Sequence, residues 1–105
     1  MGKYAILRKE FGFLAKIYGF TIDLKQKHGS YYFITWANAN KNIMVLYDEM
    51  DKNPLSIRVY DAGSFSFDAV EYKNEFVLKE GKPREQIHHA AEWLKHAIAN
   101  KTISV

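Results

Sequence analysis

The middle of the chain contains several segments typical of β-strands, and short polar turns connect them. Residues 31–36 and 43–47 are rich in aromatic and β-branched side chains, and residues 55–60 alternate apolar with polar positions. The stretches between these segments are too short to hold a helical crossover, so neighbouring strands can pair only as antiparallel hairpins. The sequence therefore predicts an antiparallel meander sheet.

A helical pattern lies on each side of this sheet region. Residues 4–18 carry apolar side chains at helical spacing, and Gly19 suits the left-handed position that ends many helices. Residues 83–100 begin with Pro83, which favours the first turn of a helix. The first stripe comprises Tyr4, Leu7, Phe11, Leu14, Ala15 and Tyr18, and the second, more regular stripe comprises Ile87, Ala91, Leu94 and Ile98.

Other segments have weaker patterns. Residues 20–24 alternate and predict a half-buried strand with Phe20, Ile22 and Leu24 on one face. Residues 65–67 could add a short fifth strand, whereas residues 68–78 fit either a turn of helix or an extended segment. Residues 102–105 are expected to form a frayed or short extended end.

These elements predict one α+β domain spanning residues 1–105. The expected order is an N-terminal helix, a four- to five-stranded antiparallel meander and a C-terminal helix. A chain of 105 residues has the usual size of one domain. Because each helix has a single apolar stripe, both helices are expected to pack on one face of the sheet.

Composition limits the location and the partners of the chain. It has no cysteine, which fits a reducing cytoplasm, and no segment approaches the roughly 20 apolar residues of a membrane span. We therefore expect a cytoplasmic protein without a membrane partner. The net charge is +3, but the basic residues are spread along the chain, which argues against nucleic-acid binding. The basic balance itself argues against an acidic mimic of nucleic acid.

No motif in the sequence carries recognisable catalytic chemistry. The string from Gly63 to Phe67 lacks the second glycine of a nucleophile elbow, and no glycine-rich phosphate loop is present. The loop containing Asp48, Glu49, Asp51 and Asn53 gathers oxygen ligands without the spacing of a calcium loop. We expect no catalytic residue and no cofactor, and an enzymatic role stays only as a lesser alternative.

Four side chains on one side of the C-terminal helix have a spacing that could chelate a metal ion. They are Glu85, His89, Glu92 and His96, opposite the stripe of Ile87 and Leu94. Glutamate and histidine one turn apart are also ordinary partners on a solvated helix surface. The solvated surface is the favoured interpretation, so no metal site is predicted.

The aromatic residues of the central strands provide the best functional signal. If the helices cover the side of Tyr32, Ile34 and Trp36, then Tyr31 and Phe33 point to the other side. They are joined there either by Met44 and Leu46 or by Ile43, Val45 and Tyr47 of the next strand. The predicted partner-binding residues are Tyr31, Phe33, Met44, Leu46 and Tyr60.

The leading hypothesis is a non-enzymatic module that binds a protein partner, or a second copy of itself, through this aromatic sheet face. It competes with an arrangement in which residues 68–78 fold across the face and make it part of the core. The plan of helix, meander and helix is similar in architecture alone to small bacterial and phage-encoded proteins, including immunity-type and inhibitor proteins. A ligand pocket or minor enzymatic site between sheet and helices is the second hypothesis, and weak nucleic-acid binding is the third.

Overall fold

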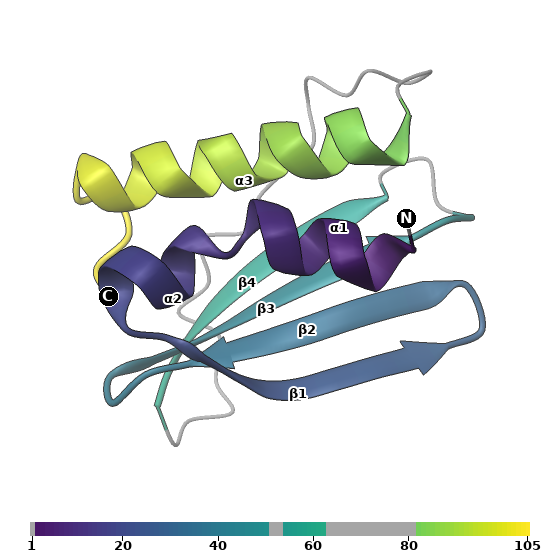
Figure 1. Cartoon of the computed structure of the whole chain (residues 1–105). Coiled ribbons are helices and arrows are strands. Elements are labelled where there is room, and N and C mark those ends of the chain that lie inside the picture. Colours follow the sequence, from purple (N-terminus) through teal and green to yellow (C-terminus); the bar gives the residue numbers. More distant parts are fainter. Residues whose placement is uncertain (1, 51–53, 63–81) are drawn as a thin grey trace.

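The computed structural model describes residues 2–50, 54–62 and 82–105. These residues form α1 (Lys3–Glu10), α2 (Phe13–Tyr18), β1 (Thr21–His28), β2 (Tyr31–Ala37), β3 (Lys41–Asp48), β4 (Leu55–Asp61) and α3 (Pro83–Ala99). The strands form one antiparallel sheet in the order β1-β2-β3-β4 (Figure 1). The predicted α+β meander is confirmed. The possible fifth strand at 65–67 and the ambiguous segment 68–78 lie outside the described residues.

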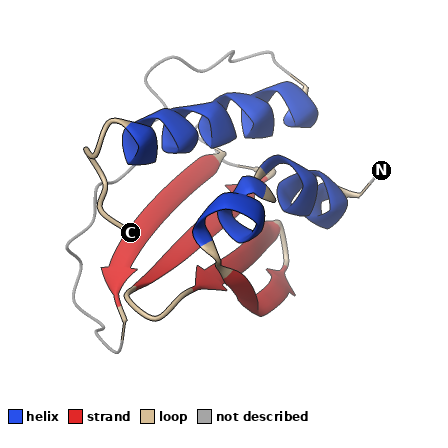
Figure 2. Ribbon diagram, turned by 60° about the vertical axis from the view of Figure 1, so that its left-hand side comes forward, coloured by secondary structure: helices blue, strands red, loops and turns tan. Residues whose placement is uncertain are grey.

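All three described helices lie on the same side of the sheet (Figures 1 and 2). α1 contacts β2 and α3, and α3 also contacts β4. The helices therefore form one layer over the sheet, as the single apolar stripe of each helix predicts.

The core lies between these two layers. On β2, β3 and β4 every second side chain faces the helices, and antiparallel pairing aligns these side chains into rows across the sheet. The rows are Tyr32, Tyr47 and Leu55; Ile34, Val45 and Ile57; and Trp36, Ile43 and Val59. The central row has no exposed surface, and the predicted stripe of α3 belongs to the same buried cluster.

The sequence predicts one continuous N-terminal helix, and this prediction is wrong at its centre. The chain breaks between α1 and α2 at Phe11 and Gly12, where the backbone N–H of Gly12 donates to the carbonyl of Lys9 at 3.3 Å. A Cβ on Gly12 would lie 3.1 Å from the Arg8 carbonyl oxygen, so glycine permits the tight turn. The break leaves Phe11 fully buried, whereas the predicted stripe residue Ala15 is exposed.

α2 and α3 are each followed by a left-handed residue that returns the chain to the core. After α2, Gly19 has φ 71°, and the N–H of Phe20 donates to the carbonyl of Leu14 at 3.0 Å. After α3, Lys101 has φ 62°, and the N–H of Ile103 donates to the carbonyl of Ala97 at 3.0 Å. The expected frayed end is therefore wrong for Ile103, which is 3% exposed.

Replacing Gly19 by alanine is expected to lower the free energy of unfolding by about 1–2 kcal/mol. No atom lies within 4 Å of a Cβ built on Gly19, so the loss comes from the left-handed backbone and not from a clash. Gly19→Asn should lose less, because asparagine tolerates this conformation better than alanine does. Urea denaturation of the three proteins measures the order, and an alanine variant as stable as the wild type would contradict it.

β1 departs from the predicted strand. Phe20 is buried but precedes the strand, and a β-bulge between Ile22 and Leu24 shifts the register. Ile22 pairs with Trp36 on the helix side, whereas Leu24 pairs with Thr35 on the opposite side. The expectation that Phe20, Ile22 and Leu24 share one buried face is wrong: Ile22 and Leu24 are 41% and 45% exposed.

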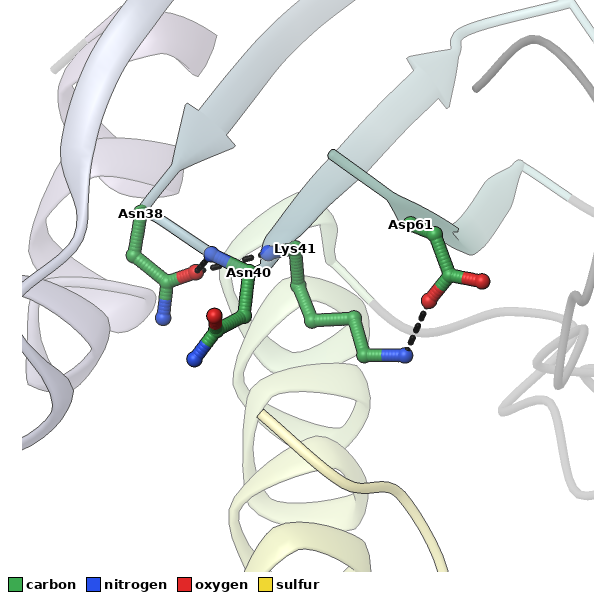
Figure 3. A network of polar contacts seen from close by, with 4 residues as sticks. All are labelled: Asn38, Asn40, Lys41 and Asp61. Carbon is green, nitrogen blue, oxygen red and sulfur yellow. Dashed lines mark hydrogen bonds and ion pairs between the residues drawn. The ribbon is translucent and has the colours of Figure 1, made fainter. Parts of the chain in front are cut away.

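Side-chain contacts close the turn between β2 and β3. The Asn38 Oδ1 atom accepts hydrogen bonds from the backbone N–H groups of Asn40 and Lys41, at 2.8 and 2.7 Å. The Lys41 ammonium group forms an ion pair with Asp61 of β4, its neighbour across the sheet (Figure 3). These contacts hold the short turn and fix the register that decides which side chains of β3 face the helices.

Candidate functional site

The sheet surface opposite the helices, here named the far face, contains all five predicted partner-binding residues. Phe33 of β2 lies directly across from Leu46 of β3, and Tyr31 lies across from Asp48. Met44 pairs with Thr35 on one side and Arg58 on the other, while Tyr60 pairs with Asn42. Directly opposed residues share a face, so the register selects Met44 and Leu46, and it turns Ile43, Val45 and Tyr47 toward the helices.

Burial differs among the residues of the far face. Tyr31 is 45% exposed, whereas Phe33, Met44, Leu46 and Tyr60 are half-buried. The central pair of Phe33 and Leu46 is therefore less accessible than the aromatic ring of Tyr31 at the end of the strand. The competing prediction, that residues 68–78 cover this face, lies outside the described residues.

Leu24 and His28 also lie on the far face, although sequence reasoning did not place them there. Leu24 reaches it because the bulge in β1 reverses the side to which the following residues point. The imidazole ring of His28 stacks on the ring of Phe33, with the centroids 6.2 Å apart and the planes at 22°. His28 carried a sequence signal, since it directly precedes the Gly29 turn and so pairs with Tyr31. The bulge had none.

The histidine and glutamate side chains of α3 lie at the surface. Glu85, His89 and His96 are exposed, and His96 Nε2 lies 3.9 Å from Glu92 Oε2. A shallow groove beside α1 is lined by Glu10, Arg84, Glu85, His88, His89 and Glu92. In the described part of the chain, no group of three or more histidine, cysteine, aspartate or glutamate side chains is placed to hold a metal ion.

The contact that crosses this groove uses a different histidine from the two in the predicted set. His88 Nδ1 lies 2.7 Å from the Glu10 carboxylate, which joins α3 to the last residue of α1. Glu10 is largely buried, with 19% of its side chain exposed. The contact between His88 and Glu10 therefore links the two helices that line this groove and holds α1 on α3.

The carboxylate of Asp48 stabilises a loop. Asp48 is 8% exposed, and its Oδ1 atom accepts hydrogen bonds from the Ser30 hydroxyl at 2.8 Å and from the Met50 backbone N–H at 3.0 Å. The Glu49 backbone N–H donates to the Ser30 carbonyl at 3.1 Å. These bonds tie the end of β3 to the turn before β2 and engage Asp48 within the protein. Asp51 and Asn53 of the same loop lie outside the described residues.

Lysine and tyrosine side chains form a second surface cluster where α1 crosses β1 and β2. Lys25 Nζ lies 4.8 Å above the ring of Tyr4, and Lys27 Nζ lies 4.9 Å above the ring of Tyr32. The two rings meet edge to face with centroids 5.3 Å apart. Tyr4 belongs to the first helical stripe, but nothing in the sequence showed that its ring would meet a lysine from an edge strand.

Electrostatic interactions in this cluster also involve Lys3 and Glu49. Lys3 Nζ lies 3.1 Å from Glu49 Oε1. The hydrogen bond between them raises the pKa of Lys3 and lowers the pKa of Glu49. Burial raises the pKa of Tyr4 and of Tyr47, because it disfavours their charged form. Both phenols therefore stay neutral at physiological pH.

Comparisons of the chain with protein-family models, with curated proteins and with solved structures found no significant match. Among the described helices, none is long and apolar enough to cross a membrane.

Proposed function

We propose that this chain is a non-enzymatic interaction module that docks onto a partner protein through the far face of its sheet. One observation carries the proposal: the three described helices cover a single face of the sheet (Figure 2), while the other face carries apolar side chains on three neighbouring strands. These side chains are those of Leu24, Tyr31, Phe33, Met44 and Leu46. Contiguous apolar surface rimmed by polar residues is typical of protein-binding sites.

The exposure of these side chains argues for a transient contact. Of the five, only Leu24 and Tyr31 are more than a third exposed, so the face offers less apolar area than the roughly 800 Å² per partner of a standard stable interface. Tyrosine supplies a large, rigid contact surface with a polar hydroxyl at its end. We therefore take Tyr31 as the main anchor of the contact and expect a partner that is a different protein.

The Tyr31→Ser variant is expected to lose at least about tenfold in affinity for the partner, since aromatic anchors dominate such contacts. The partner is first obtained by capture from the native host, and the purified partner is then titrated by calorimetry. Ile17→Ser is the matched control, because Ile17 is 60% exposed on α2, away from the sheet. Its affinity should equal that of the wild type.

Thermal melts and sedimentation of the wild type and of the Tyr31→Ser and Phe33→Ser variants test the proposal without a partner. Tyr31→Ser should shift the midpoint by only a few degrees, as surface substitutions usually do. A strictly monomeric wild type that loses stability strongly on Tyr31→Ser and on Phe33→Ser would show that the chain itself covers the far face, and the proposal would be refuted. If the wild type forms dimers and Tyr31→Ser dissociates them, the partner at the far face is a second copy of the chain and not a different protein.

A ligand pocket between sheet and helices has no support among the described residues. The side chains of Ile34, Val45 and Ile57 have no exposed surface and belong to the same buried cluster as Leu94 of α3. This part of the interlayer space is filled by protein.

A further inference from the structure

β1 forms an edge of the sheet whose outer side is not paired with any other described strand (Figure 1). The strand has eight residues, and all of them except Gln26 are exposed. An edge strand presents a row of N–H and C=O groups that an extended segment can join. Within the described sheet, the outer edge of β1 is thus a position that a strand from another molecule could join.

Lys25 and Lys27 give this edge a defined charge pattern. Lys25 pairs with Ile34 and Lys27 pairs with Tyr32, so both point to the helix side of the sheet. Alternate residues of a strand lie about 6.6–6.8 Å apart. The contacts with the rings of Tyr4 and Tyr32 hold the two ammonium groups against the surface. The two positive charges are thus held in position along the strand before any ligand binds.

Neither lysine is neutralised by a carboxylate in the part of the chain that the structure describes. The ion pairs found there join Lys3 to Glu49, Lys41 to Asp61, His88 to Glu10 and His96 to Glu92. Lys27 contributes to lowering the pKa of Glu49, but that carboxylate has its hydrogen bond with Lys3. Lys25 and Lys27 can therefore take up further negative charge from a ligand.

Charge also decides which strand fits this edge. If the β1 strands of two copies paired antiparallel around Gln26, Lys25 of each copy would lie opposite Lys27 of the other, and like charges directly opposite destabilise a sheet. A segment with carboxylates at alternate positions would place one acidic side chain opposite each lysine at the same spacing. The exposed side chain of Ile22, on the same side of the sheet as the two lysines, offers apolar contact next to these pairs.

We propose that the β1 edge binds an extended acidic segment of another protein, with glutamate or aspartate at alternate positions, by strand addition. This surface is distinct from the far face, and the inference does not depend on the docking proposed there. The ring faces of Tyr4 and Tyr32 are occupied by ammonium groups, which favours carboxylates over stacked nucleobases as the ligand.

The test uses a fluorescein-labelled peptide in which glutamates alternate with threonine and valine, titrated with the full chain at low salt. An isomer of the same composition with its glutamates consecutive is the first control. The alternating peptide should bind about tenfold more tightly than the isomer, an effect of the size expected for two matched cross-strand charge pairs. N-methylation of the backbone of the alternating peptide should abolish binding, because strand addition needs its N–H groups.

Protein variants test the position of the site. A double variant, Lys25→Gln with Lys27→Gln, should weaken binding about tenfold. The control double variant, Lys9→Gln with Lys95→Gln, changes the net charge equally at exposed helix positions and should bind as the wild type does. Tyr31→Ser should also bind normally, which separates this site from the far face.

Three results would overturn the proposal. They are equal binding of the alternating and consecutive peptides, binding that survives N-methylation, and equal losses in the two double variants. The peptide comparisons use the wild-type chain, so they decide the matter even if a double variant does not fold.

Discussion

Replacing Phe11 by alanine is expected to lower the free energy of unfolding by about 3–5 kcal/mol, the cost typical of deleting a buried phenylalanine ring. Phe11 lies at the break between α1 and α2 and has no exposed surface. It follows Leu7 by one helical turn and precedes Leu14, so its ring joins the buried side chains of both short helices. Alanine would leave a cavity at the point where the two helices must be held together.

Phe13 is the matched control for this substitution. It is only half-buried, although it lies two residues away and its ring centroid is 6.4 Å from that of Phe11. Phe13→Ala should therefore cost clearly less than Phe11→Ala in urea denaturation and in thermal melts. A loss equal to that of Phe11→Ala would mean that the break, and not the buried ring, determines the stability of this region.

Periodicity predicted the elements that are covered along one continuous face. The stripe of Ile87, Ala91, Leu94 and Ile98 is buried in α3 as expected, and Leu55, Ile57 and Val59 of β4 face the helices. In these elements one face is covered along its whole length, so the spacing of the apolar residues indicates directly which side chains are buried. The helix, meander and helix order followed from the same reasoning.

Elements whose burial depends on one irregular feature were not predictable in this way. Ile22 and Leu24 alternate as buried residues would, yet β1 is an edge strand with a bulge, and neither the bulge nor the missing neighbour is visible in the spacing. Ile103 follows α3, and its burial depends on the left-handed turn at Lys101. Such features arise from tertiary packing.

For the candidate site, the sequence indicated which strands carry the apolar residues but not the register that decides which of them lie on the far face. In the run from Ile43 to Tyr47, odd- and even-numbered positions are both apolar, so the sequence left open which of the two alternating sets of side chains lies on the far face. The turn after Asn38 decides between them, because it aligns Phe33 with Leu46 and Thr35 with Met44. The cluster of Lys25 and Lys27 with Tyr4 and Tyr32 was not predictable, because it needs contacts between segments far apart in the sequence.

The Leu94→Ala variant is expected to lose about 2–5 kcal/mol of unfolding free energy, which would lower the thermal midpoint by roughly 10 °C or more in a domain of this size. Leu94 has no exposed surface and occupies the centre of the buried stripe of α3. Its neighbours on the helix include Ala90, Ala91 and Ala97, whose small side chains cannot extend into the space that the leucine leaves. We therefore expect a loss in the upper part of this range.

Two further variants separate cavity formation from a general sensitivity of the fold. Leu94→Met keeps the volume and should cost less than about 1.5 kcal/mol. Ile17→Ala removes a side chain that is 60% exposed and should stay within about 0.5 kcal/mol of the wild type. Urea denaturation should show these differences as shifts of the midpoint with an unchanged slope, since each variant folds to the same structure. A Leu94→Ala midpoint equal to that of the wild type would show that α3 does not pack on the sheet through this stripe. The arrangement in which all the described helices lie on the side away from the far face would then fail with it.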